Sequence, residues 1–193
     1  MERREVFMEN SRKLMLHPQH LEVLFAFKSK LSNVFRDVLG IHEIHHIALT
    51  RINEHNELVS LSSTPSMEFN LFSSSLWHFD QTYNPQWYKL GGQAFWQALY
   101  DPERYDELYY LKQIKHAFPI GLSMAAKIDN DYVIYSLASR KSCPHTQELF
   151  TSQHDDFYKI GQYCSNMLNP LFNYCDAVSA QNLPLQVHYE TSK

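Results

Sequence analysis

The chain has 193 residues, of which 44% are hydrophobic and 20% are charged, and its formal net charge is −4 at pH 7. This length and composition favour one globular domain over a disordered chain. The acidic balance excludes the basic surface that direct binding of a nucleic acid requires. The five glycines lack the spacing of dinucleotide-binding and P-loop motifs, so the sequence indicates no cofactor.

Two features of the sequence bear on the cellular compartment. Residues 1–16 mix charged and single apolar residues and lack the apolar core of a signal peptide, and no later stretch is long and apolar enough to span a membrane. We therefore expect a cytoplasmic protein with no membrane segment. The odd number of cysteines, without C-x-x-C spacing, predicts no disulfide among Cys143, Cys164 and Cys175.

The N-terminal half predicts a helix, a hairpin and a second helix. Apolar residues recur at steps of three and four from Leu21 to Val38, which indicates a helix that ends at Gly40. The runs HHIALTRI and ELVSLSS flank a polar turn at residues 53–56 and predict a hairpin. Thr64 and Pro65 are typical of a helix start, and the expected apolar side of that helix carries Phe69, Phe72, Leu76 and Phe79.

The C-terminal half predicts a second hairpin between helices. Residues 83–100 are dense in aromatic side chains and suggest loops with short helices. A helix is expected from Asp101-Pro102 to just before Pro119. The runs GLSMAAKI and YVIYSLAS surround residues 129–131 and predict a hairpin. A long helix is expected from about His145 to Phe172, and the residues after Cys175 are weakly patterned.

These elements predict an α+β fold. The two hairpins are separated by helical segments, so we expect them to join into a single antiparallel sheet with helices packed on it, the plan of PAS-like and GAF-like domains. The expected organisation is an N-terminal segment at residues 1–20, one domain at 21–175 and a tail at 176–193.

Residues 40–65, GIHEIHHIALTRINEHNELVSLSSTP, and residues 116–139, HAFPIGLSMAAKIDNDYVIYSLAS, resemble the sensor domain of LuxR-type transcription regulators. The likeness covers roughly residues 21–172. In that family the second hairpin ends in Ser-Leu-Ala, which matches Ser136, Leu137 and Ala138 here. The resemblance implies a signal-binding fold. Only some twenty residues follow Phe172, so the family's helix-turn-helix domain is not expected.

The resemblance leaves two placements for the binding residues. The family has a Tyr-Pro-x-x-Trp segment after the first hairpin, and Thr64–Phe69 lacks its Tyr and Trp. A second alignment places Tyr83, Trp87 and Asp101 on the family's Tyr, Trp and Asp, after an inserted helix. A ligand pocket needs apolar walls with a few polar groups, although core packing would also explain this aromatic segment. The expected ligand-binding residues are Tyr83, Trp87, Tyr88, Trp96 and Asp101.

An enzymatic alternative comes from His42-Glu43-Ile44-His45-His46, which matches the zinc motif H-E-x-x-H. On a helix the two outer histidines could bind zinc while Glu43 acts as a general base. The run from Ile47 to Arg51 is instead typical of a strand, on which the two histidines would lie about 13 Å apart. We therefore expect no metal site and keep a metal-dependent hydrolase as the alternative.

Two further sequence patterns resemble catalytic motifs only weakly. Gly121–Ala125 approaches the G-x-S-x-G elbow, but a strand continues through Ser123. Cys143 lies before a helix start, which could lower its thiol pKa, and a loop cysteine is the simpler interpretation.

The sequence thus favours a non-enzymatic sensor that binds a small molecule and acts through a partner protein or as a homodimer, paired by its N-terminal or C-terminal helix. A third alternative is a protein-interaction module whose own side chains fill its interior.

Overall fold

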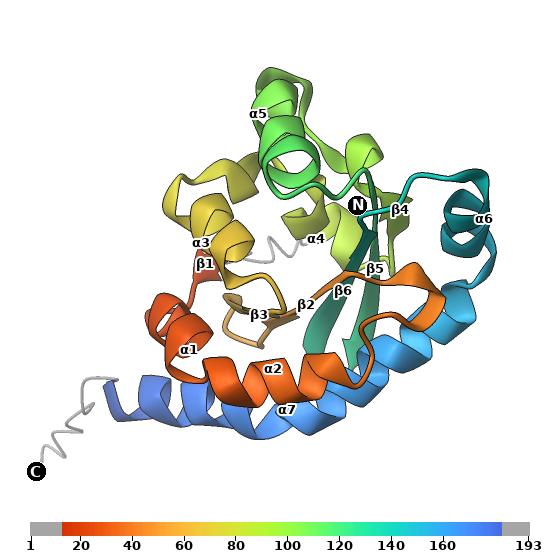
Figure 1. The fold of residues 1–193 in the computed structure, drawn as a ribbon. Helices are drawn as coiled ribbons and strands as arrows, with labels where there is room; N and C mark the ends of the chain where they lie inside the picture. Colours follow the sequence, from red (N-terminus) through yellow and green to blue (C-terminus); the bar gives the residue numbers. More distant parts are fainter. Residues whose placement is uncertain (1–12, 183–193) are drawn as a thin grey trace, which may run out of the picture.

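The computed structural model describes residues 13–182. Its centre is a six-stranded sheet in the order β1-β3-β2-β6-β5-β4, in which neighbouring strands are antiparallel except that β1 is parallel to β3 (Figure 1). The strands are β1 (Met15–Leu16), β2 (His46–Ile52), β3 (Glu57–Ser62), β4 (Gln93–Phe95), β5 (Ile120–Ile128) and β6 (Asp131–Ser139). Residues 1–12 and 183–193 lie outside the described residues. They include most of the N-terminal stretch in which we expect no signal peptide and most of the expected C-terminal tail.

The two predicted hairpins form the middle of this sheet. β2 pairs with β3 and β5 pairs with β6, and the hairpins join through β2 and β6, where Ala48 faces Ser136. The predicted α+β fold with a sheet built from two hairpins is therefore confirmed. The expected wholly antiparallel sheet is in fact mixed, because the edge strand β1 runs parallel to β3. The edge strands β1 and β4 were not predicted, because two or three residues are too few to show a period of two.

Within residues 13–182, seven helices and several short helical turns surround the sheet. The helices are α1 (His20–Ala26), α2 (Lys28–Arg36), α3 (Pro65–Ser73), α4 (Pro85–Tyr88), α5 (Tyr105–Tyr109), α6 (Pro144–Ser152) and α7 (His154–Asn182). The helical turns are η1 (Ile41–Glu43), η2 (Leu76–Phe79), η3 (Gln81–Tyr83), η4 (Trp96–Leu99), η5 (Pro102–Arg104) and the π-helical η6 (Tyr110–Lys115). Within residues 13–182 no helix combines the length and apolarity needed to cross a bilayer.

Three predicted helices have different boundaries in the structure. The first is divided at Phe27 into α1 and α2, and the last is divided at Gln153 into α6 and α7. The second ends at Ser73 instead of reaching Phe79, because Ser75 has a left-handed backbone with φ of 60°. Pairing of β1 and the length of α7 extend the folded region on both sides of residues 21–175.

Helices cover both faces of the sheet. α2 and α7 run side by side under one face, and α3 to α5 lie on the other (Figure 1). The face toward α2 and α7 carries large apolar side chains, among them Ile47, Leu49, Val59, Leu61, Tyr135 and Leu137.

The central part of the opposite face of the same strands carries small or polar side chains, whereas Ile52, Leu58 and Ile134, nearer the hairpin turns, are large and apolar. Residues alternate between the two faces of a strand, so this face receives His46, Ala48, Thr50, Ser60, Ser62, Ser123, Ser136 and Ala138. Small side chains leave depth above the sheet, and large aromatic residues of the covering layer enter it. Several buried polar side chains lie between this face of the sheet and the covering layer.

Candidate functional site

A group of polar side chains lies buried between the small-residue face of the sheet and the layer formed by α3 to η6. Its members come from β2, α3, the loop before η3, the end of η4 and η6, and each is at most 5% exposed. Ionisable groups are seldom buried to this extent unless they are paired or functional. We call His46, Glu68, Asp80, Tyr100 and Lys112 the interior polar cluster.

An ion pair stands at the centre of the cluster. Lys112 Nζ lies 2.5 Å from Asp80 Oδ2, and Asp80 Oδ1 accepts a hydrogen bond from the Thr82 backbone N–H at 3.0 Å. The Lys112 ammonium also lies 4.7 Å from the centre of the Trp96 ring and 5.4 Å from that of Tyr100. The pair therefore ties η6 to the loop before η3 within an aromatic enclosure.

The backbone of η6 explains why Lys112 points inward. Leu111, Lys112 and Gln113 are consecutive and all buried, and they lie in a π-helical turn, a form that is rare and is frequent at functional sites. Ala117 follows with a positive φ of 56°, and the Phe118 backbone N–H returns a hydrogen bond to the Lys112 carbonyl at 3.3 Å. This irregular backbone presents a lysine to the interior.

Burial sets the protonation of Glu68 and His46. It raises the pKa of Glu68 to about 7, although Lys112 lowers it, and it lowers the pKa of His46 to about 3. Ser60 Oγ donates to Glu68 Oε2 at 3.3 Å, and His46 Nδ1 lies 3.0 Å from Thr64 Oγ1. At neutral pH the imidazole is therefore uncharged, and the Glu68 carboxyl keeps its proton to a higher pH than an exposed glutamate does.

Several buried polar atoms here have no hydrogen-bond partner among the described residues. They are His46 Nε2, Thr82 Oγ1, Tyr100 Oη and Gln113 Oε1. An unsatisfied buried donor or acceptor costs about 1–3 kcal/mol, so such groups in native proteins are normally paired with protein, water or ligand. The interior thus offers both donors and acceptors to a bound molecule.

Trp96, one of the predicted residues, lies against this cluster. Its Nε1–H donates to Ser136 Oγ at 2.9 Å, and its ring covers Gly121 so closely that a Cβ atom added there would lie 2.1 Å from the ring. The ring also faces Lys112, as described above. A glycine on β5 and a serine on β6 therefore hold the indole in place.

The other predicted aromatic residues belong to the same apolar core but differ in their neighbours. Burial raises the pKa of Tyr83 well above its ordinary value, and the nearby charges of Glu68 and Asp80 raise it further. Trp87 covers Gly92, and the Tyr88 ring lies 5.3 Å from the ring of Tyr132. Tyr83 and Trp96 therefore neighbour the interior polar cluster, whereas these contacts of Trp87 and Tyr88 lie in another part of the core.

Asp101 has the capping role that its position before Pro102 suggested. Its Oδ1 accepts the Glu103 backbone N–H at 2.8 Å, and its Oδ2 accepts Gln81 Nε2 at 3.5 Å. The side chain is partly exposed, and the buried carboxylate on this side is Asp80.

Sequence reasoning missed Glu68, Asp80 and Lys112 as site residues. A usable signal was nevertheless present, because in HHIALTRI, ELVSLSS and YVIYSLAS large apolar residues alternate with small or polar ones. That alternation marks a sheet face that large side chains or a ligand can approach.

The H-E-x-x-H string does not form the helix that zinc binding requires. His42 and Glu43 have positive φ angles of 48° and 61°, and His46 begins β2. The three histidines of the string lie in different surroundings. His42 Nε2 is 3.1 Å from Asp156 Oδ2, and His45 Nδ1 is 3.2 Å from Ser139 Oγ. His46 lies in the interior, with its Nδ1 3.0 Å from Thr64 Oγ1. Among residues 13–182, no three His, Cys, Asp or Glu side chains are grouped to hold a metal ion.

The remaining two patterns have structural explanations. Ser123 lies on β5 and its Oγ is 3.3 Å from Ser136 Oγ, so it is an alternating strand residue, as expected. Cys143 is exposed and precedes α6, and its contact with the Thr146 hydroxyl at 3.2 Å lowers the pKa of the thiol.

The α+β fold is that of LuxR-type ligand-binding domains, so the resemblance found in the sequence is confirmed at the level of fold. The structure of SdiA in complex with octanoyl-rac-glycerol aligns with a TM-score of 0.52 and 10% identity, over 75% of this chain and 60% of that one. The chain thus spans less than two thirds of SdiA in that complex.

Two further solved structures are similar at a lower level. Escherichia coli SdiA aligns with a TM-score of 0.49 and 11% identity, over 78% of this chain and 67% of that one. The LBD domain of VqsR from Pseudomonas aeruginosa aligns with a TM-score of 0.49 and 14% identity, over 76% of this chain and 96% of that one. No protein-family model matches the sequence, and no curated protein matches it significantly.

Proposed function

We propose that this chain is a non-enzymatic, cytoplasmic sensor domain that binds a small amphiphilic molecule between the sheet and the α3–η6 layer. The observation that carries the proposal is the interior polar cluster, in which the Tyr100 hydroxyl has no hydrogen-bond partner among residues 13–182 and His46 Nε2 faces only the Glu68 carboxylate, at 4.0 Å. The fold shared with SdiA, whose solved complex contains octanoyl-rac-glycerol, supports the same class of ligand.

The lining chemistry suits a molecule with an acyl chain and an uncharged head. The Asp80–Lys112 pair is already balanced, so a charged head would remain unpaired in the interior. The aromatic side chains of residues 83–100 provide the apolar surface. The Tyr100 hydroxyl and the side-chain carbonyl of Gln113 provide the polar contacts. In this proposal Tyr83, Trp96, Tyr100 and Gln113 bind the ligand beside the interior polar cluster. Trp87 and Tyr88 extend the apolar surface for the acyl chain into the neighbouring part of the core, and Asp101 is a polar anchor.

Native mass spectrometry and thermal unfolding with octanoyl-rac-glycerol test the proposal. Tyr100→Phe removes only a hydroxyl that has no partner in the described fold, so we expect the variant to fold normally and to bind the ligand about fivefold more weakly. Tyr110→Phe is the matched control, because Tyr110 is 59% exposed. A parent protein that neither binds nor is stabilised by the ligand would overturn the proposal for this class of molecule.

A second candidate function is a protein-interaction module without a ligand. The observation that favours it is the close packing of Lys112 against Trp96 and Asp80, because these side chains themselves occupy the interior. The same experiment separates the two functions. An interaction module is stabilised by none of a series of acylglycerols of different chain length, whereas a sensor discriminates among them.

We further propose that the sensor acts as a homodimer through α7. Tyr163, Met167 and Tyr174 are 40%, 47% and 43% exposed and, with the exposed Pro170, recur at helical spacing along one side of α7. The run from Ile160 to Cys175 contains no charged residue. A twofold interface places the same surface on both subunits, so the part of the stripe from Met167 to Tyr174 can pack on its own copy without repulsion. At the other end of the stripe the Tyr163 hydroxyl donates to Asp37 Oδ2 at 2.9 Å, which places a carboxylate at the edge of the proposed interface.

A further inference from the structure

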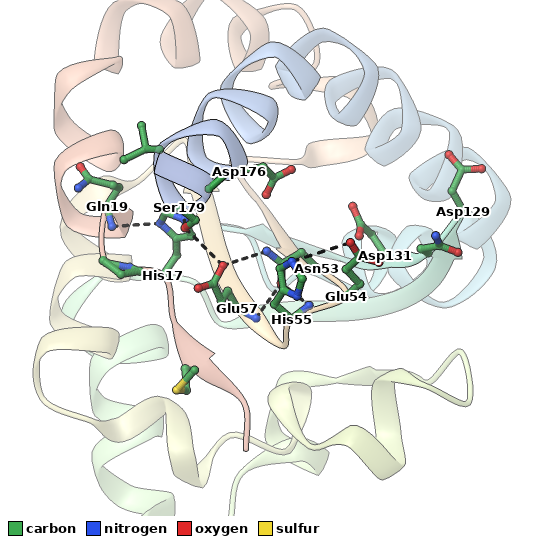
Figure 2. A pocket seen from close by; sticks show the side chains of 15 residues that line it. His17, Gln19, Asn53, Glu54, His55, Glu57, Asp129, Asp131, Asp176 and Ser179 are labelled. Carbon is green, nitrogen blue, oxygen red and sulfur yellow. Dashed lines mark hydrogen bonds and ion pairs between the residues drawn. The ribbon is translucent and has the colours of Figure 1, made fainter. Parts of the chain in front are cut away.

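A second concave surface lies away from the interior polar cluster. It is a groove of about 810 Å³ between β1, the turns of the two hairpins and the C-terminal end of α7 (Figure 2). Much of its exposed lining is apolar, and the apolar side chains in it are Met15, Pro18, Val178 and Ala180. Met15 is 52% exposed, although it belongs to a strand.

Carboxylates line the groove beside this apolar surface. They come from the β2–β3 turn, the β5–β6 turn and α7, and are Glu54, Glu57, Asp129, Asp131 and Asp176 (Figure 2). Arg51, behind the lining, pairs with Asp131 at 3.6 Å and with Asp176. Five carboxylates against one guanidinium leave a local excess of four negative charges, equal to the formal net charge of the whole chain.

The carboxylates are crowded as well as numerous. Burial raises the pKa of the Asp131 carboxyl, although the Arg51 guanidinium lowers it. Three neighbouring carboxylates add to the rise, namely Asp176, Glu54 and Asp129. Cationic groups brought into the groove would relieve this repulsion.

One wall of the groove is held by a chain of hydrogen bonds. His17 is 2% exposed, and its Nδ1 accepts the Gln19 backbone N–H at 3.0 Å, so the proton of the neutral ring is on Nε2. That Nε2–H donates to Ser179 Oγ at 2.6 Å, and the Ser179 hydroxyl faces Glu57 Oε2 at 3.5 Å. Because the His17 nitrogen that faces the Ser179 hydroxyl carries a proton, it cannot take the hydroxyl proton, so the arrangement stiffens the wall and His17 does not activate a nucleophile.

We propose that this groove docks a basic peptide segment of a partner protein, in which lysine or arginine alternates with apolar side chains. The apolar part of the lining receives the aliphatic side chains, and the carboxylates of both turns pair with the cationic ones. The proposal does not depend on ligand binding in the interior, because the groove is formed by other segments of the chain.

Fluorescence anisotropy with a labelled Lys-Leu-Arg-Leu-Lys-Leu-Arg peptide tests the proposal on the full chain. We expect binding about tenfold tighter than that of a Glu-Leu-Glu-Leu-Glu-Leu-Glu peptide or of a Lys-Ser-Arg-Ser-Lys-Ser-Arg peptide. Asp129→Asn together with Glu54→Gln should weaken binding at least about fivefold. Both residues are exposed, and asparagine tolerates the positive φ of 53° at position 129.

The control variant removes two negative charges from a surface outside the groove. Glu148→Gln together with Asp155→Asn, both exposed on α6 and α7, should change the affinity by less than about twofold. Ala180→Arg should abolish binding by placing a cation in the groove. The proposal would be overturned if the two double variants lost the same affinity, or if the Lys-Ser-Arg-Ser-Lys-Ser-Arg peptide bound as tightly as the peptide with leucine. Full displacement of the labelled leucine peptide by spermidine would also overturn it, in favour of a site for small cations.

Discussion

The Lys112 ammonium lies 2.5 Å from the Asp80 carboxylate, and both side chains are almost completely buried. Lys112 comes from the π-helical turn η6, and Asp80 caps the turn η3, so the pair joins two irregular segments above the small-residue face of the sheet. This relationship fixes the layer that encloses the proposed ligand site.

Breaking this ion pair should be costly. Asp80→Asn keeps a capping oxygen for the Thr82 N–H but leaves the Lys112 charge buried and unpaired, so it should lower the free energy of unfolding by about 3–5 kcal/mol. Asp80→Asn combined with Lys112→Met should cost less than Asp80→Asn alone. Urea unfolding measures both. The exposed Arg104–Glu107 pair is the control, and Arg104→Gln should change stability by less than about 1 kcal/mol. An equal effect at both pairs would show that burial is not the cause.

Glu68 should make stability depend on pH. Its folded pKa of about 7 lies above the unfolded value of 4.5, so the folded state binds more protons in between, and the contribution of Glu68 to stability is lost as pH rises through this window. Glu68→Gln removes this loss, so its stability relative to the parent should increase by up to about 3 kcal/mol between pH 4.5 and 7. Denaturant unfolding at several pH values tests this, and a pH-independent difference would contradict it.

Gly121 should be required for the position of Trp96. A Cβ atom there meets the indole ring, so Gly121→Ala should destabilise the fold by about 1–3 kcal/mol and change the near-ultraviolet circular dichroism. In a Trp96→Leu background the same substitution should cost much less, because the clashing ring is gone. Equal costs in the two backgrounds would mean that the ring does not set the requirement for glycine.

The uncharged stripe of α7 should control assembly. Met167→Glu places two charges at a twofold interface, so light scattering should show a monomer under conditions where the parent is a dimer. Leu90→Glu is the control, since Leu90 is 85% exposed and lies outside α7, and it should leave the mass unchanged. A parent protein that is monomeric at high micromolar concentration would contradict the dimer.

The central sheet could be predicted because its signals are local. Alternating β-branched residues on either side of residues 53–56 and 129–131 indicate two hairpins, and their pairing through β2 and β6 follows from the preference for one compact sheet. The helix ends were harder to predict, because the breaks at Phe27 and Gln153 involve neither glycine nor proline. Tertiary packing decided these boundaries.

The interior site was predicted only in part. The aromatic content of residues 83–100 predicted ligand-binding residues there, with core packing as the other explanation, and in the structure Trp96 and Tyr88 are buried. The inward direction of Lys112 depends on a π-helical turn, which has no recognised sequence signal, and a lysine in a helical pattern is normally assigned to the surface. The Asp-Pro pair drew attention to Asp101, which is partly exposed, whereas the carboxylates of Asp80 and Glu68 are buried.

Fluorine nuclear magnetic resonance of protein labelled with 5-fluorotryptophan tests the proposed ligand site most directly, because the chain has three tryptophans and gives one signal for each. We predict that octanoyl-rac-glycerol shifts the Trp96 signal saturably, and that Tyr100→Phe requires about fivefold more ligand for the same shift. A Trp96 signal that stays unchanged up to the solubility limit of the ligand would contradict binding of this class of molecule between the sheet and the α3–η6 layer.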